Sequence, residues 1–506
     1  MPGNVTQDLA QLAHARGWLE RTAILADDRA WTYAEVFDGA ARAARGYRVA
    51  GLRLGDRVLL ALPDGVEMVW SVLGAWQAGL VAVPVNVQMS PQDLLSAVET
   101  VEPALAVIDP DTAGQLELPG FAPAMKVATL VAGEPDPDFA EGGDAPALAV
   151  FTSGTTGAPK LCFFLHGNFA APPGPPGPNG GGRTTVGLSV SRMYFLGGLH
   201  FSVLTTLATG QTAVLSRTRA TPAAVIDLIE RHQVTNLFAQ PSFLARMLLE
   251  PGHEEAFARL REVSSAGEVL SPRLRERLVP ILGDRLVNNY GATEIGLISL
   301  GRPAAYRAPS AVGPAVPGRP VRIVDAAGRP MPAGRQGELH VYADFASRGV
   351  ARGSLGPDQV TDTWWPTGDL ASIDDDGVLH VHGRLDDVEV IGGQNVVPGE
   401  VERLLERHPR VLEAAVSSVR RPAGDTSLRA YVVTVPGDDE AAGAAQDAAQ
   451  DAAQDAALEA ELIALARSRL SWYKVPQDVV RLDTLPRNAN GKLLRRHLRA
   501  AGDQYV

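Results

Sequence analysis

The sequence predicts an α/β fold: a large N-terminal domain of two parallel-sheet subdomains with a small β-barrel, then a small, mobile α+β domain. As far as about residue 250, short apolar runs alternate with segments of helical period, which is typical of parallel sheets covered by helices. After about residue 300, short β-type runs are separated by Gly and Pro. Beyond Gly383 helix and strand patterns mix, and we expect the domains to be 1–385 and 386–506.

The N-terminal elements follow from hydrophobic period and from Gly and Pro punctuation. Residues 31–52 carry apolar side chains at helical spacing, which predicts a helix, and the short apolar run 56–63, bounded by Gly55 and Pro63, predicts a strand. The elements predicted after these are helix 66–79, strands 80–86, 104–109, 146–154 and 212–216, helix 223–233, strand 236–241 and helix 242–250. This order predicts strands joined by crossover helices.

The C-terminal elements are shorter and more varied. Residues 310–343 predict an antiparallel barrel or sandwich. The elements expected after these are helix 398–409, strands 412–421 and 428–436, and helix 458–470. The Pro- and Gly-rich run 171–183 indicates a surface loop, and the AAQD repeat at 444–457 indicates a solvated helix or linker inserted before the last helix.

Composition restricts the class of partner. The 506-residue chain carries 46 basic and 58 acidic side chains, a net charge of −12, which argues against nucleic acid or an anionic membrane as the partner. A small ligand is therefore favoured. The single cysteine, Cys162, excludes an internal disulfide, the first residues lack the pattern of a signal peptide, and no long apolar run is present, so we expect a cytoplasmic protein.

A Gly-rich stretch, FTSGTTGAPK at 151–160, follows an apolar run. Successive amides in such a turn can point at one oxyanion, hydroxyls add donors, and a lysine adds positive charge. The residues that fit this chemistry are Thr152, Ser153, Gly154, Thr155, Thr156, Gly157 and Lys160. The spacing is not that of a Walker motif, so a P-loop kinase or GTPase is excluded. A phosphate site at the end of a strand is favoured over a plain surface loop.

Four further stretches carry polar and glycine residues in a specific order. They are VNNYGATEIG at 287–296, TGDL at 367–370, GRLDDVEVIGGQNVVPGEVE at 383–402 and PRNANGKLLRR at 486–496. Each alone predicts no more than a turn, and Asp369 is expected in one such turn. Together with the Gly-rich stretch they resemble, over essentially the whole chain, the adenylate-forming superfamily of acyl- and aryl-CoA synthetases, adenylation domains and luciferases.

The finer resemblance is to benzoate-type CoA ligases, carried by SSAGEVLS at 264–271 and RMYFLGGLHF at 192–201. It implies an enzyme that joins a carboxylic acid to ATP, releases pyrophosphate, turns its C-terminal domain and passes the acyl group to a thiol. The first step opposes like charges at the α-phosphate, so lysine and Mg²⁺ are suitable tools. By this resemblance the catalytic residues are Lys492, which would bridge carboxylate and phosphate, Thr293, which would bond the α-phosphate, and Glu294, which would hold the magnesium.

The resemblance also assigns the nucleotide site. Tyr290 would stack on adenine, Asn289 would recognise its amino group, and Asp369 and Arg384 would bind the ribose. The Gly-rich stretch would hold the β- and γ-phosphates. The further residues placed beside the nucleotide are Gly267, Glu268 and Gly291.

The remaining assignments concern the acid and the thiol. The residues implied to border the acid are Tyr194, Gly197, Gly198, His200, Ala266, Ala292 and Gly296. His200 could instead be a buried core histidine. Asp386 matches the hinge, and Gly392 and Gly393 match glycines beside a thiol tunnel, for which a plain turn is the alternative. Gln394 stands where glutamate is more usual, and Val390 where a basic residue is.

The expected function is an ATP-dependent ligase that adenylates a small, aromatic carboxylic acid and transfers the acyl group to CoA. An adenylation enzyme that loads the acid onto the phosphopantetheine of a separate carrier protein, or passes it to another nucleophile, is the alternative. A non-catalytic nucleotide-binding homologue would be expected to lack Lys492 or Glu294, and both are present. We expect no nucleic-acid or membrane partner, and a monomer or a homodimer.

Overall fold

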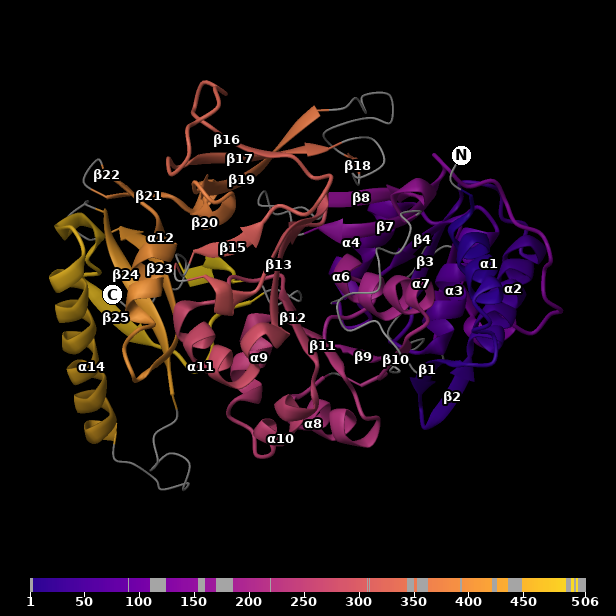
Figure 1. Ribbon diagram of the computed structural model, residues 1–506, viewed down its shortest axis with the longest axis horizontal. Coiled ribbons are helices and arrows are strands. Elements are labelled where there is room, and N and C mark those ends of the chain that lie inside the picture. Colours follow the sequence, from indigo (N-terminus) through magenta and orange to yellow (C-terminus); the bar gives the residue numbers. More distant parts are fainter. Residues whose placement is uncertain are drawn as a thin grey trace. The chain divides into compact units, whose positions relative to one another are not determined.

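Figure 1 shows the computed structural model of the chain, whose contacts divide it into two units. The structure describes residues 3–89, 91–109, 124–152, 160–169, 185–218, 220–306, 308, 310–343, 350–352, 363–391, 394–420, 426–435, 448–487, 493–495 and 497–498. Unit 1 consists of Met1–Ser264, Gly291–Leu297 and Ala343–Thr363. Unit 2 consists of Ser265–Tyr290, Ile298–Tyr342 and Trp364–Val506. The expected division at residue 386 falls inside unit 2 and stays a prediction.

Unit 1 has the alternation that the sequence predicts (Figure 1). Its helices are α1 (Val5–Ala15), α2 (Tyr33–Val49), α3 (Val66–Gln77), α4 (Pro91–Val101), α5 (Val127–Leu130), α6 (Leu196–Leu199), α7 (Thr206–Thr209), α8 (Pro222–Arg231), α9 (Pro241–Met247) and α10 (His253–Arg259). Its strands are β1 (Thr22–Ala26), β2 (Arg29–Thr32), β3 (Arg57–Ala61), β4 (Val81–Pro84), β5 (Leu105–Ile108), β6 (Ala124–Lys126), β7 (Pro146–Thr152), β8 (Lys160–Leu165), β9 (Val186–Ser189), β10 (Thr212–Val214), β11 (Asn236–Ala239) and β18 (Val350–Arg352), and β12 (Glu262–Ala266) continues into unit 2.

Two sheets organise unit 1. One has the order β18-β8-β7-β4-β3-β5-β6 and is parallel from β7 to β6, whereas β8 pairs antiparallel with both β7 and β18. In the other, β11, β9, β10 and β1 are neighbours in parallel, and β2 adds an antiparallel edge. The predicted parallel sheets are confirmed, with antiparallel strands at their margins.

The pair α2 and α3 illustrates how the helices pack. The side chain of Thr32 accepts a hydrogen bond from the amide of Glu35, whose carboxylate accepts from the amide of Thr32, so a capping box begins α2. A Cβ at Gly74 of α3 would lie 2.6 Å from the Ala43 Cβ, so glycine is required for this close approach. The large side chains Tyr33, Tyr47 and Trp76 are fully buried beside it. This core fixes the strands whose carboxyl ends carry the candidate site.

Unit 2 carries the β-rich part and the C-terminal part (Figure 1). Its helices are α11 (Pro272–Leu282), α12 (Pro398–Leu405) and α14 (Ala448–Arg469). Its strands are β15 (Ala311–Pro314), β16 (Val321–Val324), β17 (Gly337–Ala343), β19 (Thr363–Ile373), β20 (Val378–Arg384), β21 (Glu389–Ile391), β22 (Gln394–Val396), β23 (Val411–Arg420), β24 (Thr426–Thr434) and β25 (Asp478–Arg481). The strands β13 (Leu286–Ala292) and β14 (Gly296–Gly301) each contain residues of both units.

The β-rich part of unit 2 is a sheet with the order β15-β20-β19-β17-β16. In it β15 pairs antiparallel with β20, β19 with β20, and β16 with β17. Asp369 lies inside β19, opposite Arg384 of β20. The expectation that Asp369 lies in a turn is therefore wrong; Gly368, with a φ of +72°, allows the strand to change direction just before it.

In the C-terminal part, β24 lies between β23 and β25, and α12 and α14 pack on this sheet. Leu458, Leu462 and Ala466 recur at four-residue spacing and are buried on one face of α14. The helix begins at Ala448, so residues 448–457 of the AAQD repeat belong to the last helix and do not precede it. The rest of the repeat and the loop 171–183 lie outside the described residues. None of the described helices has both the length and the apolar character needed to cross a membrane.

Candidate active site

The β7 and β8 hairpin carries the two ends of the Gly-rich stretch. Thr152 ends β7, Lys160 begins β8, and the two are paired across the antiparallel register. Because β7 runs parallel to β4, the stretch begins at the carboxyl edge of the sheet, where ligands of α/β folds are bound. This confirms its expected position after a strand. The residues Ser153, Gly154, Thr155, Thr156 and Gly157 lie outside the described residues, and their role stays a prediction.

Thr293 and Glu294 lie in a tight turn between β13 and β14. The amide of Ile295 donates to the carbonyl of Ala292 at 3.2 Å, which closes the turn. A Cβ at Gly291 would lie 2.4 Å from the carbonyl oxygen of Gly296, so the glycine allows the two strands to approach. The structure thus brings Gly291, Ala292 and Gly296 together and holds Thr293 and Glu294 between them.

Glu294 lies near enough to Cys162 of β8 for its negative charge to raise the pKa of that thiol, after the larger contribution of burial. Cys162 lies two residues beyond Lys160 in the same strand. Among the described residues no cluster of three His, Cys, Asp or Glu side chains could hold a metal ion by itself. A single carboxylate such as that of Glu294 fits Mg²⁺, which commonly takes one or two carboxylates and completes its shell with phosphates and water.

In unit 2 the residues assigned to the nucleoside lie together; we call Asn289, Tyr290, Asp369 and Arg384 the nucleoside cluster. The Tyr290 hydroxyl donates to Asp369. The Arg384 Nη1 atom donates to the other carboxylate oxygen at 3.1 Å and to the Thr367 carbonyl at 2.7 Å. Burial, and then the charge of Asp369, raise the pKa of Tyr290, so the ring stays neutral.

Two buried polar atoms of the nucleoside cluster make no hydrogen bond within the described part of the chain. They are the side-chain oxygen of Asn289 and the Nε atom of Arg384. Buried polar atoms are nearly always paired, so each such atom points to a ligand or an ordered water. The Asn289 oxygen can accept from an amino group, as the assignment of adenine to this residue requires.

Gly267 and Glu268 follow β12 in unit 2. Gly267 has a φ of +87°, a left-handed conformation that favours glycine. The Glu268 carboxylate pairs with Arg487 at 3.2 Å, and Arg487 also pairs with Glu413 of β23 at 3.0 Å. The beginning of the 486–496 stretch therefore lies against Glu268, whereas Lys492 is outside the described residues. Ala266 ends β12 beside them.

Four of the residues predicted to border the acid, Tyr194, Gly197, Gly198 and His200, belong to the segment of unit 1 between β9 and β10. Tyr194 precedes α6, which contains Gly197 and Gly198. A Cβ at Gly198 would lie 2.1 Å from the Arg192 carbonyl oxygen, so this glycine packs against the backbone, whereas Gly197 is exposed. The structure therefore supports a wall position for Gly197 and a packing role for Gly198.

His200 begins a π-helical turn, His200–Thr205, that continues α6 into α7. Such turns are rare and frequently occur at functional sites. Desolvation lowers the pKa of His200, and the residue as a whole is exposed to solvent. A histidine buried in the core does not fit this exposure.

The sequence analysis overlooked Phe238, near the carboxyl end of β11. A Cβ at Gly197 would lie 3.2 Å from the Phe238 ring, which also stacks on Phe201 at 5.4 Å between ring centres. The available signal was an aromatic residue at the end of a parallel strand, where ligands are bound. We call Tyr194, Gly197, His200 and Phe238 the acid wall.

Asp386, the predicted hinge residue, lies in a single helical turn, Leu385–Asp387, directly after β20. Its carboxylate is exposed and lies 3.8 Å from Arg384, a weak surface ion pair. Such a short connection after a strand can change its backbone torsions at low cost, which suits a hinge. Gly392 and Gly393 lie outside the described residues, so the thiol tunnel stays a prediction.

Comparison with known proteins gives concordant matches. The model of the AMP-binding enzymes matches residues 12–354, and that of the AMP-binding enzyme C-terminal domain matches residues 400–492. A p-hydroxybenzoic acid–AMP ligase of Mycobacterium tuberculosis is 34% identical, over 98% of this chain and 69% of that protein. A 3-hydroxybenzoate–CoA ligase of Aromatoleum sp. is 31% identical, over 96% and 94%. A benzoate CoA ligase of Burkholderia xenovorans superposes with a TM-score of 0.85 at 26% identity, over 98% and 99% of the two chains.

Proposed function

Because the chain belongs to the family of AMP-binding enzymes, we propose that it joins a small aromatic carboxylic acid to AMP and then to the thiol of CoA. The observation that carries the nucleotide assignment is the nucleoside cluster, with its buried Asn289 oxygen and Arg384 Nε atom that have no partner within the described residues. The acid is proposed as aromatic because relatives act on hydroxybenzoates and because Gly197 faces the flat ring of Phe238.

In the first step a carboxylate oxygen of the acid attacks the α-phosphorus of ATP. The new bond is between oxygen and phosphorus, and pyrophosphate leaves with the electron pair of the broken bond. The barrier is largely repulsion between anions, so positive charge held in place lowers it. Lys492 is proposed to neutralise both reactants, Thr293 to donate a hydrogen bond to the α-phosphate, and the 152–160 stretch to hold the leaving group. Mg²⁺, held by Glu294 and the phosphates, would supply further positive charge.

In the second step the thiolate attacks the carbonyl carbon of the acyl adenylate. The carbon–sulfur bond forms, and AMP leaves. Asp386 is proposed as the hinge for this step, and Gly392 and Gly393 as the positions where the pantetheine arm passes, since a Cβ there would obstruct it. Replacing Gly393 by a bulky residue should spare pyrophosphate release and block thioester formation.

A carrier protein is the second candidate for the acceptor. The observation that favours it is the 34% identity to a protein whose stated product is an acyl adenylate and not a CoA ester. Either acceptor presents the same phosphopantetheine thiol, so the residues above serve both. The enzyme is proposed to be a monomer or a homodimer.

Carboxylate-dependent exchange of pyrophosphate into ATP, measured without a thiol, tests the first step. The panel comprises benzoate, hydroxy- and aminobenzoates, cinnamates, short fatty acids and amino acids. Exchange with ring acids alone is the expected result, and exchange with none of the panel would contradict the proposal. Adding CoA or a phosphopantetheinylated carrier to the active acid then identifies the acceptor by the thioester formed.

A further inference from the structure

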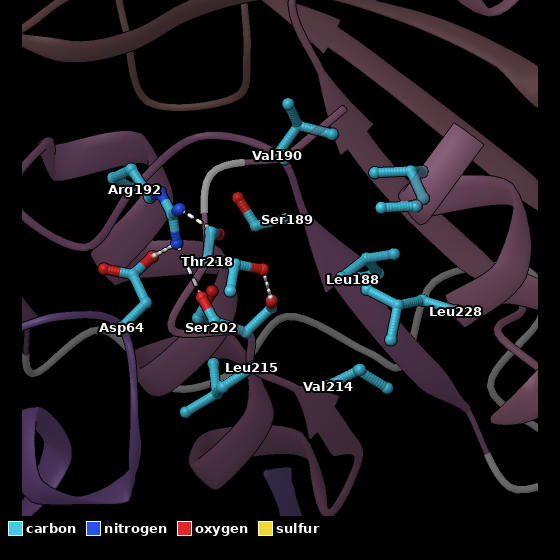
Figure 2. A pocket seen from close by; sticks show the side chains of 14 residues that line it. Asp64, Leu188, Ser189, Val190, Arg192, Ser202, Val214, Leu215, Thr218 and Leu228 are labelled. Atoms are coloured by element: carbon cyan, nitrogen blue, oxygen red, sulfur yellow. Dashed lines mark hydrogen bonds and ion pairs between the residues drawn. The ribbon is translucent and has the colours of Figure 1, made fainter. Parts of the chain in front are cut away.

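A small cavity lies in unit 1, beside Arg192 in the segment between β9 and β10 (Figure 2). It is bordered by the ends of the parallel strands β9 and β10 and by α8, and its volume is about 20 Å³. A space of this size holds roughly one water molecule and no substrate. Leu188, Val214 and Leu228 supply apolar wall, and Figure 2 shows Asp64 and Arg192 facing one another at one side.

Asp64 is a buried carboxylate that holds a neighbouring backbone segment. It is 7% exposed and follows β3, in the sheet that does not contain β9. Its two oxygens accept from the amide of Met193 at 3.2 and 3.3 Å, and Arg192 lies 3.6 Å away. Because Met193 directly precedes Tyr194, this contact fixes the backbone at the start of the acid wall.

Arg192 extends the same attachment to β10. Its guanidinium donates to the carbonyl of Ser216 at 2.6 Å and to that of Thr218, both just beyond β10. The Arg192 carbonyl in turn accepts from the amide of Phe195 at 3.0 Å. The backbone around Tyr194 is therefore held by side chains from two sheets, although none of these side chains belongs to the acid wall.

We propose that Asp64 is a positioning residue for acid binding: by accepting the Met193 amide and pairing with Arg192, it sets where Tyr194 and α6 stand. This inference rests on the proposed function, because it assumes that the acid wall binds the carboxylic acid. Asp64 touches neither reactant, and its effect reaches the acid through the backbone of 192–194.

The charge on Asp64 matters for this role. Burial raises the pKa of Asp64 to about 6, against the opposing effect of Arg192. The other charged groups on neighbouring elements are Arg217 beyond β10, Glu67 of α3 and Asp109 beyond β5, with Arg217 pairing with both carboxylates. At neutral pH the carboxylate is ionised and attracts Arg192, and below about pH 6 protonation weakens this attraction.

The test compares Asp64→Ala with Asp64→Asn and with Asp109→Ala in pyrophosphate exchange. Asp109 is also a buried carboxylate paired with an arginine, at 2.7 Å, which makes it the matched control. A lost hydrogen bond to a charged group predicts that Asp64→Ala raises KM for the acid by about tenfold. KM for ATP should stay unchanged. Asp64→Asn keeps an acceptor for Met193 and should restore part of the loss.

A pH profile separates positioning from general damage to the fold. In the wild-type enzyme KM for the acid should rise as the pH falls through about 6, whereas in Asp64→Asn it should not change over that range. Asp109→Ala should keep the wild-type profile. Substrates that stay ionised at pH 5.5 should be used, so that their own titration does not contribute.

The outcomes separate the two proposals. Suppose that the wild-type enzyme is active in exchange. If Asp64→Ala then leaves KM for the acid unchanged, or changes KM for the acid and for ATP equally, the positioning role is overturned and the proposed function stays intact. Absence of exchange in the wild-type enzyme would refute both. Should Asp64→Ala fail to fold, the pH profile of Asp64→Asn decides alone: a profile like that of the wild type would overturn the proposal.

Discussion

The nucleoside cluster of unit 2 and the acid wall of unit 1 are organised in opposite ways. In the nucleoside cluster the proposed ligand-binding side chains hold one another, since Tyr290 and Arg384 both bond Asp369. In the acid wall the proposed binding residues are positioned by residues outside the wall, namely Asp64, Arg192 and the closely packed Gly198. The first arrangement couples Tyr290, Asp369 and Arg384 to one another, whereas the second leaves the wall residues themselves free to differ.

This difference predicts how the two regions respond to substitution. A change in the nucleoside cluster should disturb several contacts at once, because its members share hydrogen bonds. A change in the acid wall should alter which acid fits and leave the rest of the enzyme intact. Substitutions in the two regions should therefore separate into effects on ATP and effects on the acid.

The largest effect is expected outside both regions. If Lys492 acts on the reacting groups, Lys492→Ala should lower kcat for adenylate formation by roughly 10² to 10³, the range for a lost electrostatic contact to a transition state. Neither substrate should be affected selectively. Transfer of the acyl group from a pre-made adenylate should stay close to wild type, and Lys126→Ala, on the exposed end of β6, is the control. Equal loss in both half-reactions would contradict the assigned role.

Asp369→Asn is expected to give the next largest effect. It keeps the size of the side chain but removes the charge that Arg384 and Tyr290 share, so KM for ATP should rise by about tenfold to a hundredfold. KM for the acid should stay the same. Asp374→Asn, which removes an exposed carboxylate 2.9 Å from His380 at the other end of the hairpin, should leave both constants unchanged. If Asp369→Asn raised KM for the acid and not KM for ATP, the contrast between the nucleoside cluster and the acid wall would be contradicted.

Gly197→Val should have a smaller and different effect. A Cβ at position 197 would lie 3.2 Å from the Phe238 ring. The methyl groups of valine would therefore reduce the space for an acid beside the acid wall and should raise KM for ring acids by about tenfold. Short aliphatic acids should lose less, and ATP should bind as before. Measuring exchange activity over a panel of acids tests this prediction. If the order of activities among the acids is unchanged, Gly197 does not border the acid.

The smallest effect concerns stability and involves Glu406, a partly buried carboxyl of unit 2. Burial, and then the charge of Glu402, raise the pKa of Glu406 from 4.5 to about 8. The folded state thus favours the protonated form, so the contribution of Glu406 to stability is complete below about pH 4.5 and is lost as the pH rises through 8. Glu406→Gln should therefore raise the urea midpoint at pH 8.5 and change it little at pH 5.

Glu400→Gln is the control for this measurement, because Glu400 lies in α12, which Glu406 directly follows, and is paired with Lys474 at 2.6 Å. If Glu400→Gln and Glu406→Gln change the pH dependence of the urea midpoint equally, the environment of Glu406 does not cause that pH dependence.

Much of the fold could be predicted from the sequence because period and punctuation are local signals. The helix over 66–79 and the strand over 56–63 appear as α3 and β3 with shorter ends. The strands β19 and β20 were not predicted as a pair, since TWWPTGDL contains Pro and Gly that suggest a turn. Pairing with Arg384 of β20 overrides this local preference, and such a partner is distant in sequence.

The proposed ligand-binding residues could be predicted from sequence motifs, whereas the residues that position them could not. Asn289, Tyr290, Asp369 and Arg384 carry recognisable neighbours in the sequence, and the structure brings them together. Asp64 carries no such signal, and the signal of Phe238, an aromatic residue at the end of a strand, is weak because such residues are common in any core. Their meaning depends on which backbone they touch, and only the packing of two sheets decides that.

The interleaving of the two units has a consequence for synthesis on the ribosome. Unit 1 includes residues as late as Thr363, and β1 pairs with β10 through partners as distant as Ile24 and Ala213. In an emerging chain β2 can pair with one edge of β1 at once, whereas the edge that pairs with β10 stays open until residues 212–214 have been made. Long-range pairing of this kind folds slowly and leaves apolar strand edges open to aggregation. Production at low temperature, with chaperones that cover such edges, should increase the yield of folded enzyme.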